Sequence, residues 1–290
     1  MERTERKKIK NNKNTTKSNS FNEKNNNFKE KDKINYKKSL GQNFLYDTNL
    51  LNAIASDGDV NSDDTVLEIG AGAGTLTAVL AGRAKKVISF EIDTTLKNIL
   101  EEKQKQHPNI EFHFMDFMEA DIDGLFDGKA KVVANIPYYI TTPIIFKLIE
   151  RKELFDSIMV LIQKEVAERF ASKCGTKEYG ITSVILQSLF DVTIPRVVRK
   201  ECFTPAPKID SAICKLVPHN KFNISNFEEF KKFVHLAFSM RRKTLTNNLK
   251  SQYEKEKVVD ALDQCGYSDS ARPEEVSVEN FINIFEKLKK

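Results

Sequence analysis

The amino-acid sequence predicts an α/β protein in which a doubly wound, mostly parallel sheet of seven strands precedes a small all-α domain. Between residues 66 and 217, short apolar runs alternate with stretches of helical periodicity, the pattern of a sheet with crossover helices. Several of these runs end on a glycine or a polar residue, which places those residues at one edge of a parallel sheet. After Pro218 only helical periodicity remains. We therefore predict a sheet domain at 37–218 and a helical domain at 219–290.

The elements of the sheet domain follow from local patterns. Residues 66–69 form a short apolar run typical of a buried strand, and the glycine-rich turn 70–74 follows directly. Helical periodicity then predicts a helix over 75–82, which completes a strand–turn–helix unit. Further strands are predicted at 86–90 and 110–115, in a run ending at residue 135, and at 157–162, 194–199 and 210–217, with helices at 94–105, 142–152, 163–172 and 179–191.

The helical domain carries start and stop signals. Ser225 and Glu228 have the spacing of a capping box, so a helix is expected to begin there. A second helix at about 253–264 is expected to stop at Gly266, because glycine favours the left-handed cap conformation. A third helix is expected to begin near Ser277. The apolar stripe of the first helix, which we assign to the core, comprises Phe227, Phe230, Val234 and Phe238.

The positive charge of the chain is concentrated at its beginning. Residues 1–38 contain 13 Lys and Arg against 5 Asp and Glu, which leaves 33 basic and 36 acidic residues in the remainder. The segment 1–36 is rich in Asn and Lys and poor in apolar residues, so we predict a disordered tail. Two interpretations stay open for it: a flexible arm attracted to nucleic-acid phosphates, or a solvated extension without a function.

Composition excludes several classes of protein. No apolar run reaches the roughly 18 residues that span a membrane, and the first residues contain no hydrophobic core of a secretory signal. The four cysteines form no C-x-x-C pair, and the histidines lack metal-ligand spacing. We expect a cytoplasmic protein with free thiols, without a metal and without a membrane partner.

The ends of three predicted strands suggest a nucleoside cofactor. Gly70 and Gly72 belong to a G-x-G-x-G turn, which lacks the glycine placement of the dinucleotide fingerprint. Glu91 ends the next strand, where its carboxylate can grip two ribose hydroxyls, and Asp116 ends the third, where it can accept from an adenine amine. Three apolar residues can enclose that adenine: Ile92, Phe114 and Met115. This set fits S-adenosylmethionine (SAM), a nucleoside without phosphates, better than NAD.

The stretch Asn135-Ile136-Pro137-Tyr138 at the end of the fourth strand suits methylation of a planar amine. The lone pair of such an amine is delocalised into its ring. The Asn135 side-chain oxygen and the Ile136 carbonyl can each accept one N–H and favour a geometry that frees the lone pair. Pro137 stiffens the turn, and Tyr138 offers a face for base stacking.

Taken together, these motifs resemble the family of ribosomal RNA adenine dimethyltransferases, most of all its bacterial small-subunit group. The resemblance covers nearly all of residues 37–290. It rests on KSLGQNFL at 38–45, EIGAGAGT at 68–75, NIPYYITTP at 135–143, QKEV at 163–166, YG at 179–180, FTPAPKIDS at 203–211 and RRKT at 241–244.

The resemblance implies a Rossmann-like fold of the class I SAM-dependent methyltransferases. It implies that Asn43 and Leu45 contact SAM together with Gly70, Glu91, Asp116 and Asn135. The residues from Asn135 to Tyr138 would hold the target adenine, and Phe203 would supply the second stacking face. The implied reaction transfers two methyl groups to each of two adjacent adenosines in a hairpin near the 3′ end of 16S rRNA. The expected partner is the assembling small ribosomal subunit, and the enzyme would be a monomer.

Two basic clusters are expected to contact RNA, because the body of the chain is otherwise slightly acidic. One is Arg241, Arg242 and Lys243, which follows the first helix of the helical domain. A solvated cluster at a helix end is the alternative interpretation. The other, which flanks Phe203, includes Arg199 and Lys208.

Two rival functions remain. One is the related group that methylates a single adenine of large-subunit 23S rRNA and confers macrolide resistance. The segments at 163–165, 179–180 and 241–243 favour the small-subunit group. The other is a non-catalytic RNA-binding assembly factor, whose signature would be loss of Asn135, Glu91 or Asp116. All three residues are present.

Overall fold

The computed structural model describes residues 36–37, 40–240 and 242–289. All but one residue of the predicted tail at 1–36 lie outside the described residues, as does Arg241 of the predicted basic cluster. The described residues from 40 onward belong to a single compact unit. No helix in the described part of the chain is long and apolar enough to cross a membrane.

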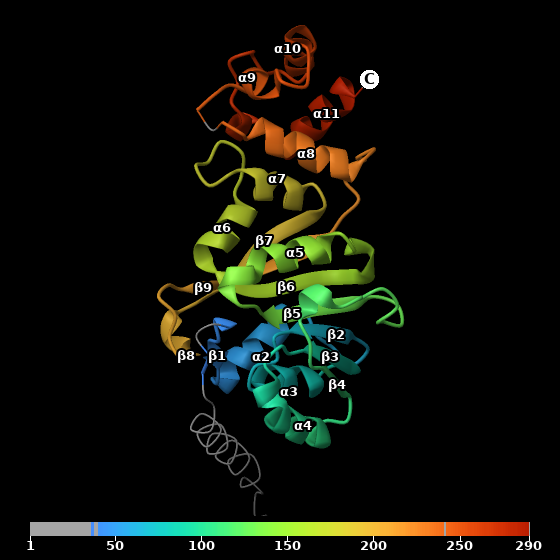
Figure 1. The fold of residues 1–290 in the computed structure, drawn as a ribbon, viewed down its shortest axis with the longest axis vertical. Helices are drawn as coiled ribbons and strands as arrows, with labels where there is room; N and C mark the ends of the chain where they lie inside the picture. The colour runs from blue at the N-terminus through green and yellow to red at the C-terminus, as the bar shows by residue number, and fades with distance from the viewer. Residues whose placement is uncertain (1–35, 38–39, 241, 290) are drawn as a thin grey trace, which may run out of the picture. The chain divides into compact units, whose positions relative to one another are not determined.

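A seven-stranded sheet with the order β4-β3-β2-β5-β6-β9-β7 forms the centre of the fold (Figure 1). The pairs β3–β4, β2–β3, β2–β5 and β5–β6 are parallel, whereas β9 is antiparallel to both β6 and β7. The predicted mostly parallel, seven-stranded sheet is therefore confirmed. The strands are β2 (Thr65–Ile69), β3 (Lys86–Phe90), β4 (Ile110–His113), β5 (Ala130–Asn135), β6 (Phe155–Gln163), β7 (Phe190–Val198) and β9 (Ser211–Pro218).

Helices cover both faces of this sheet because successive strand residues point to opposite sides. Val66 of β2 packs in a buried cluster with Leu51 and Leu80, which come from α2 and α3. Its neighbour Leu67 belongs to the opposite cluster, with Ile145 of α5. The helices of this part are α2 (Thr48–Asp57), α3 (Thr75–Ala81), α4 (Lys97–Gln106), α5 (Thr141–Ile149), α6 (Lys164–Ala171) and α7 (Ile181–Gln187).

Beyond β9 the described residues form only helices, as the sequence predicts (Figure 1). The buried hydroxyl of Tyr179 donates to the Val276 carbonyl at 3.0 Å and ties this segment to the sheet part. Phe230 and Phe281 share one continuous core with Leu67, so the predicted domain boundary at 218/219 stays a prediction. The helices are α8 (Phe227–Ala237), α9 (Leu245–Leu249), α10 (Lys255–Asp263) and α11 (Val278–Leu288).

Two local predictions need correction. The helix predicted at 179–191 ends with α7 at Gln187, because Phe190 already pairs with Pro218 as the first residue of β7. The capping box is also wrong: Asn226 is the N-cap of α8 and its side chain accepts from Glu229 N at 3.1 Å. By contrast, Gly266 has φ +80° and follows α10, as predicted.

Candidate active site

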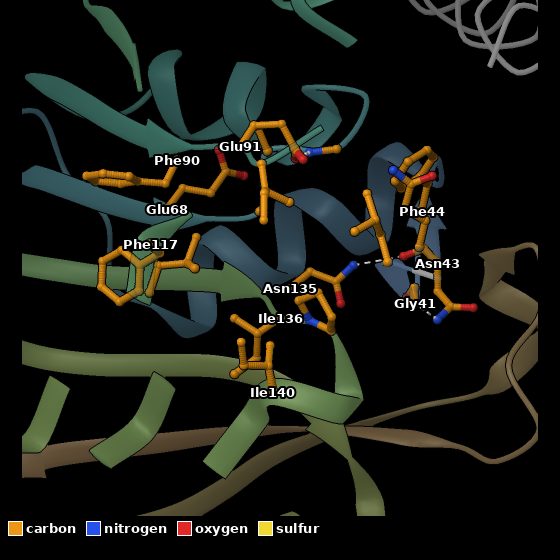
Figure 2. Close-up of a pocket in the computed structure, with 18 of the residues that line it drawn as sticks. Gly41, Asn43, Phe44, Glu68, Phe90, Glu91, Phe117, Asn135, Ile136 and Ile140 are labelled. Atoms are coloured by element: carbon orange, nitrogen blue, oxygen red, sulfur yellow. Dashed lines mark hydrogen bonds between the residues drawn. The ribbon is translucent and has the colours of Figure 1, made fainter. Parts of the chain in front are cut away.

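A pocket lies at the carboxyl ends of β2, β3 and β5 (Figure 2). The N-terminal segment 40–45 forms one of its walls. The pocket brings together most of the predicted cofactor residues and the whole predicted target motif: Asn43, Leu45, Gly70, Gly72, Glu91, Ile92, Met115, Asp116, Asn135, Ile136, Pro137 and Tyr138. Phe114, which the sequence places against the adenine, is not part of this lining. Residues far apart in the sequence therefore meet at the edge of the sheet that the strand-end pattern predicts.

The glycine turn adopts a conformation that side chains disfavour. Gly70 and Gly72 have φ values of +82° and +57°. A Cβ on Gly72 would lie 2.9 Å from the ring of Phe44, so the N-terminal segment packs directly on this glycine. The turn is held to β3 because the N–H groups of Gly70 and Ala71 both donate to the Phe90 carbonyl, at 2.8 and 3.1 Å. A side chain at Gly72 would therefore collide with Phe44, and both glycines line the pocket.

Glu91 is oriented by two backbone donors. Its Oε2 accepts from Gly72 N and its Oε1 from Asp93 N, both at 2.7 Å. Burial raises the pKa of Glu91, and these donors oppose that rise. Each carboxylate oxygen has a second lone pair, so the fixed group can still accept from two hydroxyls.

Asp116 lies beside two exposed apolar side chains. Its Oδ1 accepts from Met118 N at 2.8 Å and caps the short helix η3 (Phe117–Glu119). Ile92 and Met115 are 47% and 38% exposed, although both are large and apolar, and both line the pocket. Exposed apolar walls beside a carboxylate are suited to a flat ring that carries an amine.

The orientation of the Asn135 amide follows from one hydrogen bond. Its Nδ2 donates to the backbone carbonyl of Asn43 at 2.9 Å (Figure 2). A carbonyl can only accept, so the nitrogen must face Asn43 and the side-chain oxygen is left to accept from a ligand. Pro137 has φ −59°, and the Tyr138 hydroxyl is 2.6 Å from Ser211 Oγ. The Asn135 amide is therefore oriented with its oxygen available, and the role of the motif in holding an adenine stays a prediction.

Glu68 is a pocket residue to which the sequence assigns no role. It is fully buried in β2, and its Oε2 accepts from Thr77 Oγ1 at 2.6 Å and Ser89 Oγ at 2.7 Å. Among the described residues, Oε1 has no hydrogen-bond partner. Burial raises the pKa of Glu68 from 4.5 to about 8. Its signals in the sequence were its place in the EIGAGAGT motif and a carboxylate inside an apolar run.

This raised pKa predicts a pH-dependent stability. The protonated carboxyl stabilises the fold fully below pH 4.5, and the contribution is lost as pH rises through about 8. At roughly 1.36 kcal/mol per pKa unit, the loss is at most about 5 kcal/mol. Glu68→Gln is expected to flatten the free energy of unfolding between pH 5 and 8.5, measured by urea denaturation. An unchanged pH dependence in Glu68→Gln would refute the assignment.

Phe203 does not occupy its predicted place. Its ring is 3% exposed, and its backbone pairs with Leu45 where β8 (Phe203–Thr204) meets β1 (Phe44–Leu45). The ring belongs to the buried cluster around Leu45 and is absent from the pocket lining, so it offers no open stacking face. Tyr139, to which the sequence assigns no role, lines the pocket and is 61% exposed. The sequence feature that could have indicated Tyr139 is its position directly after the Asn-Ile-Pro-Tyr motif.

Four of the predicted RNA-binding residues are described, and these four are exposed but do not line the pocket. Arg199 and Lys208 lie at either side of β8, and Arg242 and Lys243 follow α8. The geometry assigns them no ligand, and their contact with RNA stays a prediction.

Residues 33–290 match the ribosomal RNA adenine dimethylase family. The chain belongs to this family. It is therefore a SAM-dependent enzyme that methylates adenine in ribosomal RNA, as the motifs predict.

Curated relatives align with this chain over most of its length. The ribosomal RNA small subunit methyltransferase A of Ligilactobacillus salivarius is 42% identical over 89% of this chain and 91% of its own length. The protein of the same name from Clostridium botulinum is 41% identical over 86% of this chain and 92% of its own length.

Two solved structures share the fold. A dimethyladenosine transferase from Plasmodium falciparum has a TM-score of 0.73 at 28% identity, covering 83% of this chain and 95% of the other. The 23S rRNA methyltransferase ErmE has a TM-score of 0.69 at 31% identity, covering 86% of this chain and all of the other. The predicted class I methyltransferase fold is confirmed.

The pocket fits SAM by the chemistry of its walls. The turn residues Gly70 and Gly72 belong to its lining, and among the described residues no Lys or Arg side chain lines it. It offers two carboxylates at adjacent strand ends, Glu91 and Asp116, which match a ribose and an amine. The buried Oε1 of Glu68, which has no hydrogen-bond partner among the described residues, is a further polar atom in the lining.

Proposed function

We propose that this enzyme dimethylates the N6 amines of two adjacent adenosines in a hairpin near the 3′ end of 16S rRNA. It would act as a cytoplasmic monomer on the assembling small ribosomal subunit. The observation that carries the adenine chemistry is the Asn135 amide, whose nitrogen is engaged by Asn43 and whose oxygen is left to accept. The small-subunit target is supported by relatives of that name, which are about 41% identical, against 31% for ErmE.

Different cofactor residues are proposed to contact different parts of SAM. Glu91 accepts from the two ribose hydroxyls, and its two backbone donors keep its carboxylate in place. Asp116 accepts from the adenine amine through its second oxygen, while Ile92 and Met115 cover the ring faces. Three other groups hold the rest of the molecule: Asn43 and Leu45 of the N-terminal segment, and the turn at Gly70 and Gly72.

The target motif is proposed to act by position and not by strong base catalysis. SAM supplies a methyl group on a sulfonium, so alignment of the amine provides much of the rate. Asn135 Oδ1 and the Ile136 carbonyl accept the two N–H groups of the extruded adenine and favour a free lone pair. Tyr138 provides a stacking face, which offsets part of the few kcal/mol that base extrusion costs. The proton lost after transfer leaves a cationic amine and can pass to water.

Exposed basic residues are proposed to hold the RNA outside the pocket. Arg242 and Lys243, with Arg241, would contact phosphates beside the hairpin. Arg199 and Lys208 would extend that contact on the β8 side. Phosphate contacts of this kind fix register without reading sequence.

The exposed ring of Tyr139 gives a separate prediction. Tyr139→Ala is expected to raise KM for RNA about tenfold, since stacking of a base contributes ~1–3 kcal/mol. Tyr139→Phe retains the ring and should keep KM near that of the wild type. Steady-state kinetics with varied RNA, together with calorimetry of S-adenosylhomocysteine, separates RNA binding from cofactor binding. If Tyr139→Ala left KM for RNA unchanged, Tyr139 would have no part in base stacking.

The choice of RNA tests the proposal as a whole. Radiolabelled SAM is offered with small subunits that lack the modification, and separately with unmodified 23S rRNA. Label in the small subunit alone supports the proposal. Label in 23S rRNA alone would move the enzyme to the macrolide-resistance group. Absence of label in both, with SAM bound, would favour the assembly-factor alternative.

A further inference from the structure

Lys147 makes three hydrogen bonds beside the pocket and has no role in the proposed reaction. This lysine lies in α5, the helix that follows the target motif and η4 (Tyr138–Ile140). Its ammonium donates to the carbonyls of Phe117, Met118 and Ala120, at 2.7, 2.9 and 2.6 Å. An ammonium has three N–H donors, so this one group is fully used by a single short loop.

That loop is the one that presents the predicted adenine site. Asp116 is the N-cap of η3, and the three carbonyls that receive Lys147 belong to η3 and the residue after it. The loop has further internal support, because Glu119 N donates to the Asp116 carbonyl at 3.1 Å. The ammonium also lies 5.1 Å from the centroid of the Phe117 ring, which is itself buried and lines the pocket.

The electrostatic surroundings of Lys147 agree with a structural cation. Burial lowers the pKa of its ammonium, and the charges of Asp116 and Asp121 oppose that fall. A charged group in a partly buried place is retained at a cost unless its donors are satisfied. Here three backbone carbonyls satisfy them.

We propose that Lys147 is a positioning residue for the cofactor: by fastening the loop 117–120 to α5, it holds Asp116 where its carboxylate meets the adenine amine. The proposal rests on the adenine role proposed for Asp116. Helix α5 would then connect the loop of Asp116, proposed to bind the cofactor, with the motif at Asn135–Tyr138, proposed to bind the target adenine, because α5 follows that motif in the chain.

The test measures selectivity for the adenine amine and needs no RNA. Calorimetry compares S-adenosylhomocysteine with S-inosylhomocysteine, which lacks that amine, in the wild type and in Lys147→Met. We expect Lys147→Met to weaken binding of the adenine compound on the order of tenfold and to leave the inosine compound nearly unchanged. Lys152→Met is the matched control, because Lys152 lies beyond α5 and its ammonium donates to the His219 carbonyl at 3.4 Å, away from the loop 117–120.

A double-mutant cycle excludes a general loss of structure. If Lys147 acts through Asp116, then Lys147→Met costs little further affinity in an Asp116→Asn background. Additive losses, or equal weakening of both compounds by Lys147→Met, would overturn the proposal. Lys147→Gln, which retains two of the donors, is expected to fall between wild type and Lys147→Met. Failure of wild type to prefer the adenine compound would instead refute the adenine role of Asp116, and Lys147 would have nothing to position.

Discussion

Asn135→Ala is expected to reduce methyl transfer about a thousandfold while the protein stays folded. The substitution removes an acceptor that must be in place when the amine attacks, and preorganised groups of this kind contribute roughly 10²–10³ to a rate. The fold should survive, because the deleted amide makes one hydrogen bond, to the Asn43 carbonyl, at the wall of a pocket. Single-turnover transfer at saturating SAM and RNA measures the effect on chemistry alone.

Asn135→Asp is the informative companion to the alanine variant. Its carboxylate keeps an acceptor toward the amine but can no longer donate to the Asn43 carbonyl. We expect a rate between those of wild type and Asn135→Ala, with weaker cofactor binding because the N-terminal segment is released. Thermal unfolding of both variants serves as the control for folding. A near-normal single-turnover rate in Asn135→Ala would remove the proposed amine acceptor.

Glu91→Ala has the second-largest expected effect, a loss of SAM affinity of about a hundredfold. Hydrogen bonds to a charged group contribute about 1.5–3 kcal/mol each, and the variant also leaves Gly72 N and Asp93 N without their acceptor. The turnover number at saturating SAM should fall far less than the affinity, since Glu91 is proposed to contact the ribose and not the methyl group. Calorimetric titration with S-adenosylhomocysteine measures the loss.

Glu91→Gln should be nearly as harmful, although it is close to isosteric. Both carboxylate oxygens accept from backbone N–H groups, so an amide nitrogen at either position would face another donor. Glu101→Gln is the matched control, because Glu101 is half-exposed on α4 and pairs only loosely with Lys97, at 3.7 Å. Wild-type affinity in Glu91→Gln would contradict the assigned orientation of this carboxylate.

The sequence predicts the sheet well because each buried strand has a local signature. The apolar runs that became β2, β3 and β5 end at Ile69, Phe90 and Asn135, next to the residues assigned to the site. Elements defined by tertiary pairing were missed. The two-residue strands β1 and β8 exist because Phe44–Leu45 pairs with Phe203–Thr204. Two residues are too few to show a strand pattern in the sequence, so this pairing was not predictable. The same pairing buries Phe203, which the resemblance alone had placed against the target base.

In the site, too, residues within a local motif were predictable, and residues defined by tertiary contacts were not. Residues with a motif around them, such as Glu91, Asp116 and Asn135, were placed correctly at the pocket. The role of Lys147 could not be predicted from the sequence, because its partners are three backbone carbonyls, and every residue type carries a backbone carbonyl. Glu68 belonged to a recognised motif, but its shifted pKa depends on burial from both faces of the sheet.

Mapping the methylated nucleotides separates the proposed reaction from its alternatives. The enzyme, SAM and small subunits lacking the modification are incubated to completion, and the 16S rRNA is digested and sequenced by mass spectrometry. We expect N6-dimethyladenosine at two adjacent positions in a hairpin near the 3′ end, and the loss of both in Asn135→Ala. Methylation at a single adenine, at separated positions or at an atom other than N6 would contradict it.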